Sequence, residues 1–321
     1  MNILPWHKGN WEELFTVTEK LPHALVLYGP CNSGIDIFTL EASKSLVCRN
    51  HNETEVYCNT CQDCNWFDSN SHPDIFFVGA TRIDEGTSSN NISIDLIREL
   101  KVFFELTPHQ QHGKKVAVIF DAHRMNLSSS NALLKILEEP PGESIIILTT
   151  SDLSKLLPTI KSRSRLISFS NPNLEEAKEY LGVANKQELL PFINLYAGNP
   201  LALLNDHLNY PLLAEIIHCL QQGKKFDSSN INPNWFVNGF PWLINLIQKW
   251  AYEILLSKLT HQQFYFPAEQ SKIADLASMA NISNLLRFQK KLNDLKLYAS
   301  SPINKEINLD IIFIDYRKIF I

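Results

Sequence analysis

The chain has 321 residues, of which 45% are apolar and 20% charged, and its formal net charge at pH 7 is −5. This length can hold two or three domains with a sizeable core. The acidic balance argues against a protein that binds nucleic acid alone, because neutralising phosphates needs clustered Lys and Arg. The apolar runs are too short to span a membrane, and the first 20 residues lack the apolar core of a signal peptide, so we expect a cytoplasmic protein.

The first half of the chain alternates between strand and helix signals. Short apolar runs predict five strands, at residues 24–28, 74–78, 116–120, 144–148 and 165–169. Apolar residues at helical spacing predict helices at residues 37–48, 93–104 and 131–139, and a polar loop is expected at 81–91. Strands that alternate with helices predict a parallel α/β sheet.

The pattern changes near Ser170. From there to Ile321 strand signals are scarce, and apolar residues recur at helical spacing, which predicts an all-helical region. A stretch rich in Asn, Ser and Pro at residues 226–233 is expected to separate two helical units.

Four of the six cysteines lie in one short stretch: Cys48, Cys58, Cys61 and Cys64. The last three form two overlapping C-x-x-C units, a spacing that lets thiolates turn toward a single ion. Four thiolates satisfy tetrahedral zinc and leave no position for water, which predicts a structural site. Such a polar turn cannot build its own apolar core, so the metal would supply folding energy. The alternatives are disulfides, which the expected compartment disfavours, and an iron–sulfur cluster.

A phosphate-binding loop without its working residues follows the first predicted strand. Residues 29–36 have the glycine spacing of the Walker A motif, G-x-x-x-x-G-K-[ST], with Gly29 and Gly34 in place. Ile35 stands where a lysine would neutralise phosphates, and Asp36 stands where a hydroxyl would hold magnesium. The alternative interpretation is that the two glycines merely shape a turn between strand and helix.

The strand at 116–120 leads into Asp121 and Ala122, at the place of a Walker B motif. Asp121 could hold magnesium, but Ala122 replaces the glutamate that usually polarises water in such ATPases. Three groups needed for hydrolysis are therefore missing, and we expect this chain neither to hold a nucleotide cofactor nor to hydrolyse ATP. The alternative is an active ATPase subunit with a divergent nucleotide pocket.

Two further motifs carry a resemblance to a known family. The run N-A-L-L-K-I-L-E-E-P-P spans residues 131–141, and Ser162-Arg163-Ser164 follows the next strand. With the cysteine insertion and Ser71-His72-Pro73-Asp74 after it, the chain resembles the clamp-loader branch of the AAA+ family, in particular the delta-prime subunits of bacterial DNA polymerase III. The resemblance is strong over residues 4–169 and weaker beyond, where it depends on Ala197-Gly198-Asn199-Pro200 and the helical pattern.

The resemblance implies three domains: an AAA+ P-loop-type domain at 1–169 with a zinc module at about 48–64, a small helical lid at 170–208, and a helical collar at 209–321. It implies a non-hydrolysing subunit of a clamp loader, a hetero-pentameric ring with motor subunits of gamma or tau type and a delta subunit. Through this complex the chain would reach a sliding clamp and primed DNA. In the family the motor subunits keep the lysine of the phosphate loop, whereas delta-prime subunits lack it.

The resemblance also implies that Arg163 is an arginine finger, acting in trans on ATP bound by the neighbouring motor subunit. A planar, permanently charged guanidinium suits the charge that spreads over phosphoryl oxygens. The alternative is a structural arginine paired with a nearby acid at a domain edge. A stand-alone, zinc-dependent nucleic-acid binder is a third hypothesis, which the acidic balance of the chain disfavours.

Overall fold

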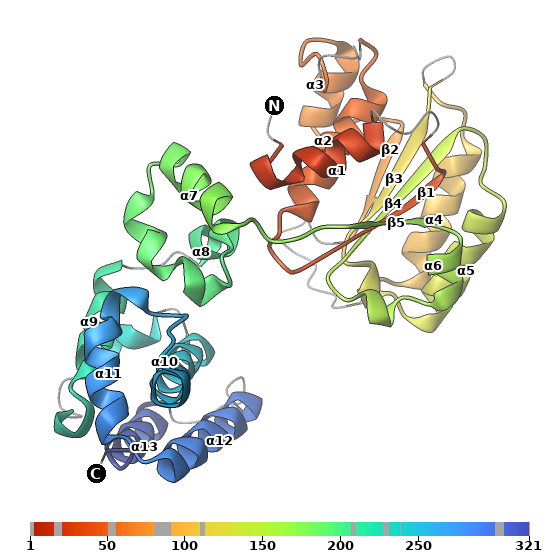
Figure 1. Cartoon of the computed structure of the whole chain (residues 1–321). Helices are drawn as coiled ribbons and strands as arrows, with labels where there is room; N and C mark the ends of the chain where they lie inside the picture. Colours follow the sequence, from red (N-terminus) through yellow and green to blue (C-terminus); the bar gives the residue numbers. More distant parts are fainter. Residues whose placement is uncertain are drawn as a thin grey trace. The chain divides into compact units, whose positions relative to one another are not determined.

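The computed structural model describes residues 3–15, 21–50, 56–79, 91–109, 113–206, 210–226, 231–237, 239–298 and 305–320. The chain forms two compact units, Met1–Pro172 and Asn173–Ile321 (Figure 1). The expected division into residues 1–169, 170–208 and 209–321 stays a prediction. The loop expected at 81–91 lies almost entirely outside the described residues, and so does the middle of the stretch at 226–233.

A five-stranded parallel sheet forms the centre of the first unit. Its strands are β1 (Ala24–Tyr28), β2 (Ile75–Val78), β3 (Lys115–Ile119), β4 (Ser144–Thr150) and β5 (Arg165–Ser168). Their spatial order is β2-β3-β4-β1-β5, and every neighbouring pair is parallel. The predicted parallel sheet is confirmed, and β3 and β4 are buried along their whole length, as expected of central strands that are covered on both faces.

Helices cover both faces of this sheet. They are α1 (Lys8–Phe15), α2 (Ile35–Val47), α3 (Gln62–Asp68), α4 (Ile94–Glu105), α5 (Leu127–Glu138) and α6 (Pro158–Ser162), with short 3-10 turns η1 (Pro5–His7), η2 (Ala122–Arg124) and η3 (Leu153–Lys155). Figure 1 shows α1, α2 and α3 on one face and α4, α5 and α6 on the other. The side chains of β1 divide accordingly: Leu25 and Leu27 join the core around Phe38, whereas Val26 joins the core around Leu133.

Capping residues decide where the helices begin. Helix α5 begins four residues before the expected Asn131, because the side chain of Asn126 accepts a hydrogen bond from the backbone N–H of Ser129. The helix ends at Glu138, just before Pro140, which cannot continue it. Ser93 caps α4 in the same way as Asn126 caps α5.

The described part of the second unit is helical apart from an isolated bridge between Ala280 and Phe320. Its helices are α7 (Leu174–Val183), η4 (Gln187–Tyr196), α8 (Pro200–Asn205), α9 (Tyr210–Gln221), η5 (Gly223–Lys225), η7 (Pro233–Phe236), α10 (Phe240–Thr260), η8 (Pro267–Glu269), α11 (Gln270–Met279), α12 (Ile282–Tyr298) and α13 (Lys305–Arg317). Trp235 and Trp250 lie fully buried in its main core, as expected of packing residues. None of the described helices combines the length and apolar character needed to cross a bilayer.

Hydrogen bonds join the helices before residue 206 to those after residue 210. The side chain of Asn194 donates to the carbonyl oxygen of Phe264 over 2.6 Å, and Trp242 Nε1 donates to Tyr196 Oη over 3.3 Å. Lys249 also donates to the carbonyl oxygen of Leu195. The two expected helical parts therefore pack as one compact unit.

Replacing Gly29 by Ala should lower the free energy of unfolding by about 1–3 kcal/mol. A Cβ at this position would lie 2.4 Å from the carbonyl oxygen of Phe169, a backbone atom that cannot turn away. Urea denaturation of the two proteins measures the difference. Gly9→Ala in α1 is the matched control, because an added Cβ meets no atom within 4 Å there. Equal effects of the two substitutions would contradict the prediction.

Candidate functional site

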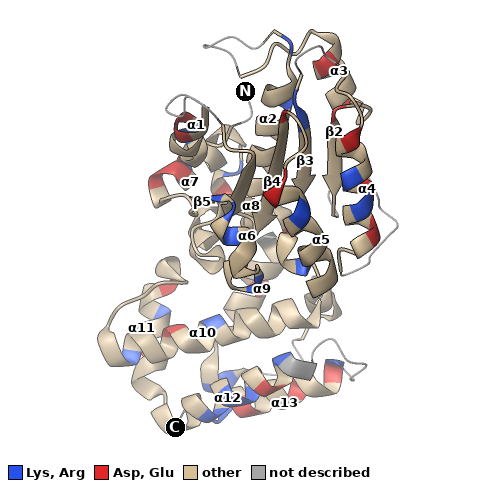
Figure 2. Ribbon diagram, turned by 90° about the vertical axis from the view of Figure 1, so that its right-hand side faces the viewer, with Lys and Arg blue, Asp and Glu red and all other residues tan. Residues whose placement is uncertain are grey.

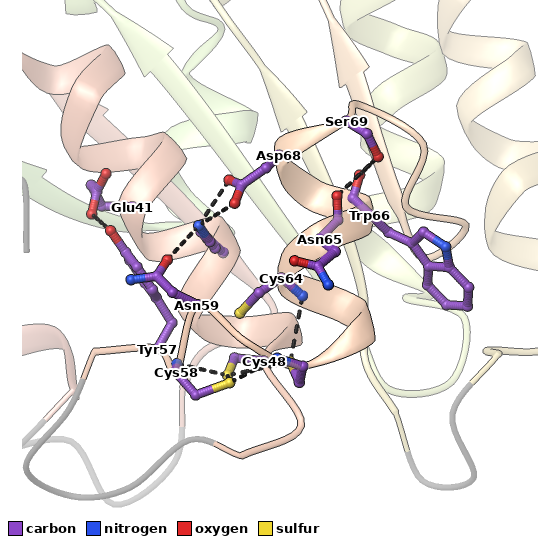
Figure 3. Close-up of polar contacts among 12 residues, drawn as sticks. Glu41, Cys48, Tyr57, Cys58, Asn59, Cys64, Asn65, Trp66, Asp68 and Ser69 are labelled. Atoms are coloured by element: carbon purple, nitrogen blue, oxygen red, sulfur yellow. Dashed lines mark hydrogen bonds and ion pairs between the residues drawn. The ribbon is translucent and has the colours of Figure 1, made fainter.

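The four cysteines converge where α2 ends and α3 begins (Figure 3). Cys48 follows the last residue of α2, Cys61 caps the N-terminus of α3, and Cys64 lies in its first turn. Their four Sγ atoms all lie within 4.8 Å of one another. Cys48 Sγ is 3.7 Å from Cys58 Sγ and 4.0 Å from Cys61 Sγ. The structure therefore brings together the whole set that the spacing predicted.

Backbone N–H groups point at three of these sulfurs. Cys58 N donates to Cys48 Sγ over 3.3 Å, Cys61 N donates to Cys58 Sγ over 3.3 Å, and Cys64 N donates to Cys61 Sγ over 3.4 Å. Hydrogen bonds, first from the backbone of Thr60, lower the pKa of Cys58 to about 6. Burial raises the pKa of Cys48 and of Cys64, so those two thiols need a cation to ionise at neutral pH.

These residues fit a tetrahedral metal ion with four sulfur ligands. A Zn–S bond of about 2.3 Å places sulfurs at tetrahedral corners about 3.8 Å apart. The separations of 3.7 Å and 4.0 Å around Cys48 match this value. Soft thiolates select zinc or an iron–sulfur cluster over magnesium and calcium. The four cysteines could therefore hold zinc.

Lys44 ties the cysteine turn to α2. Its Nζ lies 2.8 Å from Asp68 Oδ1 and 2.8 Å from Asn59 Oδ1, and it covers the ring of Tyr57. Tyr57 in turn donates to Glu41 Oε2 over 2.6 Å (Figure 3). Lys44 is only 7% exposed, whereas the side chain of Asp68 is 57% exposed, so the ion pair is shielded from water on the lysine side only. Sequence reasoning missed Lys44, although its position one helical turn before Cys48 could have indicated it.

A buried carboxylate links the cysteine turn to the sheet. Asp63 is completely buried, with Arg49 Nε 3.2 Å from Oδ2 and His72 Nε2 3.6 Å from Oδ1. Burial lowers the pKa of His72, while the charge of Asp63 opposes this effect. His72 leads into β2 through Asp74, whose carboxylate accepts from the backbone N–H of His109. Through His72 and Asp74, the segment Ser71-His72-Pro73-Asp74 therefore connects the cysteine turn to β2.

A second cluster lies at the carboxyl edge of the sheet, where loops after β1 and β3 meet the end of β4. The backbone N–H of Asp121 donates to Thr149 Oγ1 over 3.2 Å, and that hydroxyl lies 3.5 Å from Asp36 Oδ1. Loss of surrounding water, and then the charge of Asp121, raise the pKa of Asp36. The loop carries no lysine, and its acid is brought close to the acid of the Walker B position.

The phosphate-loop segment has the expected strand–loop–helix setting. Gly34 adopts a φ of 92° as the N-cap of α2, a conformation that favours glycine. The side chain of Ile35 is buried in the apolar core with Phe38. Trp6 Nε1 donates to the carbonyl oxygen of Ser33 over 3.0 Å, so the η1 turn packs against this loop. Sequence reasoning did not indicate this contact.

Arg163 lies immediately after α6, on the sheet face opposite the cysteine module. Its Nη2 is 2.9 Å from Glu138 Oε1, and its Nη1 donates to the carbonyl oxygen of Thr159 over 3.3 Å. The side chain is 38% exposed. Arg165 pairs separately with Glu13 over 2.7 Å. The acidic partner expected of a structural arginine is therefore present in the free chain, with the guanidinium still accessible to solvent.

The charges of the first unit are mixed. On α4 Lys and Arg alternate with Asp and Glu, including the pairs Arg98–Asp95 and Lys101–Glu105. Figure 2 shows both signs interspersed along the described ribbon. Mixed charges of this kind on α4 differ from the clustered Lys and Arg that a protein binding nucleic acid alone uses to neutralise phosphates.

The sequence model of a family described as DNA polymerase III, delta subunit, matches residues 12–173. The chain belongs to this family. The DNA polymerase III subunit delta′ of Pseudomonas aeruginosa is 28% identical over 270 residues, 82% of this chain and 80% of the relative. The subunit delta′ of Escherichia coli is 30% identical over 210 residues, 64% of this chain and 60% of the relative. The resemblance to delta-prime subunits is thus confirmed.

A solved structure of a gamma subunit-related protein of DNA polymerase III from Thermotoga maritima aligns over 96% of this chain and 98% of that protein. Its sequence identity is 19% and its TM-score 0.44.

The free energy of unfolding of this chain should fall as the pH decreases from 6.5 to 4, because the folded state keeps His7 from binding a proton. This side chain is 1% exposed, and burial lowers its pKa from 6.5 to about 4. Between these values only the unfolded chain binds the proton, so His7 costs about 1.4 kcal/mol of stability per pH unit, and this loss ends below pH 4.

The measurement compares the chain with a His7→Leu variant by urea denaturation at pH 7 and pH 5. The difference in unfolding free energy between the two proteins should shift by about 2 kcal/mol in favour of the variant at the lower pH. Effects of other titrating groups cancel in this comparison. A difference that stays constant with pH would contradict the expected pKa.

Proposed function

We propose that this chain is a delta-prime-type subunit of the DNA polymerase III clamp loader that does not hydrolyse ATP itself. It takes its place in a hetero-pentameric ring with motor subunits of gamma or tau type and a delta subunit, in the cytoplasm. The ring loads a sliding clamp onto primed DNA. In this assembly Arg163 reaches the ATP held by the neighbouring motor subunit.

The observation that carries the non-hydrolysing role is the pair of acids at the carboxyl edge of the sheet. A phosphate loop works by surrounding phosphates with N–H groups, a lysine and magnesium. Here Ile35 is buried in the core, and Asp36 lies beside Asp121 through their shared contact with Thr149. A triphosphate in this position would meet two carboxylates without a neutralising lysine. Ala122 offers no group to polarise the attacking water.

The chemistry of Arg163 suits a group supplied in trans. Its ion pair with Glu138 joins two partly exposed side chains, 38% and 49% accessible, and such pairs contribute about 0–1 kcal/mol. A phosphoryl group that carries several charges can therefore bind the N–H groups that Glu138 and Thr159 leave available, at little cost. The planar fork then stabilises the charge on the equatorial oxygens during transfer. Hydrolysis in the neighbour becomes dependent on assembly of the ring.

Zinc held by Cys48, Cys58, Cys61 and Cys64 is the proposed cofactor, and its role is structural. Four thiolates fill the tetrahedral shell, so the ion provides cross-linking of the turn to α2 and α3 and no open position for substrate. The bonds of Lys44 and the Asp63 pairs then hold the module against the sheet.

Replacing Arg163 by Ala should lower DNA-stimulated hydrolysis at the neighbouring ATP site about tenfold or more, because a finger contributes charge that water cannot replace. The reconstituted loader is assayed for single-turnover ATP hydrolysis with primed DNA and clamp, after gel filtration has verified assembly.

Arg165→Ala is the matched control, since it removes an arginine two residues away with its own acidic partner. It should leave hydrolysis unchanged. Normal hydrolysis with Arg163→Ala would refute the finger, and ATP turnover by the isolated chain would favour a divergent ATPase instead.

Removing the metal should destabilise the first unit. The purified chain should contain one zinc ion, and chelation or Cys61→Ser should lower its melting temperature by at least about 5 °C. Cys31→Ser is the control, because Cys31 is an exposed cysteine outside the cluster. Elemental analysis that finds iron with sulfide, or no metal with disulfides in its place, would overturn the zinc assignment.

A further inference from the structure

We propose that Glu138 is a positioning residue for Arg163, which keeps the guanidinium oriented for the phosphate of the neighbouring subunit. This inference rests on the role of Arg163 proposed above. Its basis is the contact between Glu138 Oε1 and Arg163 Nη2 at 2.9 Å. Nothing in the amino-acid pattern pointed to this contact, because 25 positions separate the two residues along the chain.

Two elements hold the guanidinium at two of its nitrogens. Glu138 on α5 pairs with Nη2, and the carbonyl oxygen of Thr159 on α6 accepts a hydrogen bond from Nη1. Two bonds to different nitrogens fix the plane of the group as well as its position. An arginine has five N–H donors, so about three remain available for a phosphate. Glu138 can therefore stay in contact while the finger acts.

The backbone on both sides of this contact is rigid. Leu137, next to Glu138, and Ile160 of α6 are buried in the same apolar core. The backbone N–H of Arg163 donates to the carbonyl oxygen of Ile160 over 3.2 Å, and Ser164 Oγ donates to the same oxygen over 2.9 Å. The backbone of Arg163 is therefore held in place, and the direction of its side chain depends on the contacts with Glu138 and Thr159.

The location of Glu138 is unfavourable for a carboxylate without a cation. It is the last residue of α5, where the helix dipole presents partial negative charge, and Glu139 follows it directly. Arg163 compensates this local excess of negative charge. The negative charge at the end of α5 also attracts the guanidinium of Arg163 and so holds it near the end of the helix.

A matched ion pair of the same chemistry lies two residues further along the chain. Arg165 contacts Glu13 Oε1 over 2.7 Å, with exposed fractions of 34% and 49% that resemble those of the Arg163 pair. Removing Glu13 therefore disturbs a comparable surface pair without touching the finger.

The experiment measures ATP hydrolysis by the reconstituted loader with Glu138→Ala, Glu138→Gln, Arg163→Ala, Glu138→Ala combined with Arg163→Ala, and Glu13→Ala. With primed DNA and clamp present, Glu138→Ala should lower kcat about 2- to 10-fold and leave KM for ATP unchanged, because orientation matters in the transition state. Glu138→Gln keeps an acceptor oxygen and should recover part of the loss. Glu13→Ala should behave as the natural protein.

The double variant separates positioning from a general structural effect. If Glu138 acts through Arg163, adding Glu138→Ala to Arg163→Ala should cause no further loss. An additive loss, or a kcat for Glu138→Ala that is unchanged or raised, would overturn the positioning role while the finger stands. An Arg163→Ala protein with normal kcat would overturn the finger itself, and with it this role of Glu138.

Discussion

The parallel pairing of β1 with β4 on one side and with β5 on the other positions the phosphate-loop segment at the carboxyl edge of the sheet. Tyr28 at the end of β1 lies opposite Thr150 and Ser168, and the backbone N–H of Phe169 donates to its carbonyl oxygen. The phosphate-loop segment must therefore begin at the same edge where β4 ends, close to the turn after β3. The approach of Phe169 leaves space at position 29 for glycine alone.

This close packing gives the degenerate phosphate loop a structural reason to persist. Its glycines are needed where the backbone of β5 passes and where α2 begins, whether or not a nucleotide binds. The functional residues of the loop carry no such constraint. Ile35 fills the core, and Asp36 lies 3.5 Å from the Thr149 hydroxyl, which also accepts from the backbone N–H of Asp121. The same geometry holds strand, turn and helix together although no lysine follows Gly34.

The cysteine module and Arg163 lie on opposite faces of the sheet and depend on different physics. The bonds of Lys44 and the buried Asp63 hold the cysteine module, and its four sulfurs lie within 4.8 Å of one another. Arg163 lies in an ion pair that solvent can reach, and such pairs contribute about 0–1 kcal/mol. The first arrangement fixes a turn inside the fold, whereas the second leaves an arginine at the surface.

The sequence by itself determined the strands, the parallel sheet and the cysteine set, because apolar runs, alternation with helices and ligand spacing are local patterns. It also predicted that Ile35 and Asp36 replace the usual Walker residues, and its motifs indicated the family. Tertiary structure alone decided that Asp36 and Asp121 share a contact with Thr149, that Lys44 bonds to the cysteine turn, and that Glu138 pairs with Arg163. These contacts join residues far apart in the chain, and their partners follow from strand order and helix packing, which no local pattern encodes.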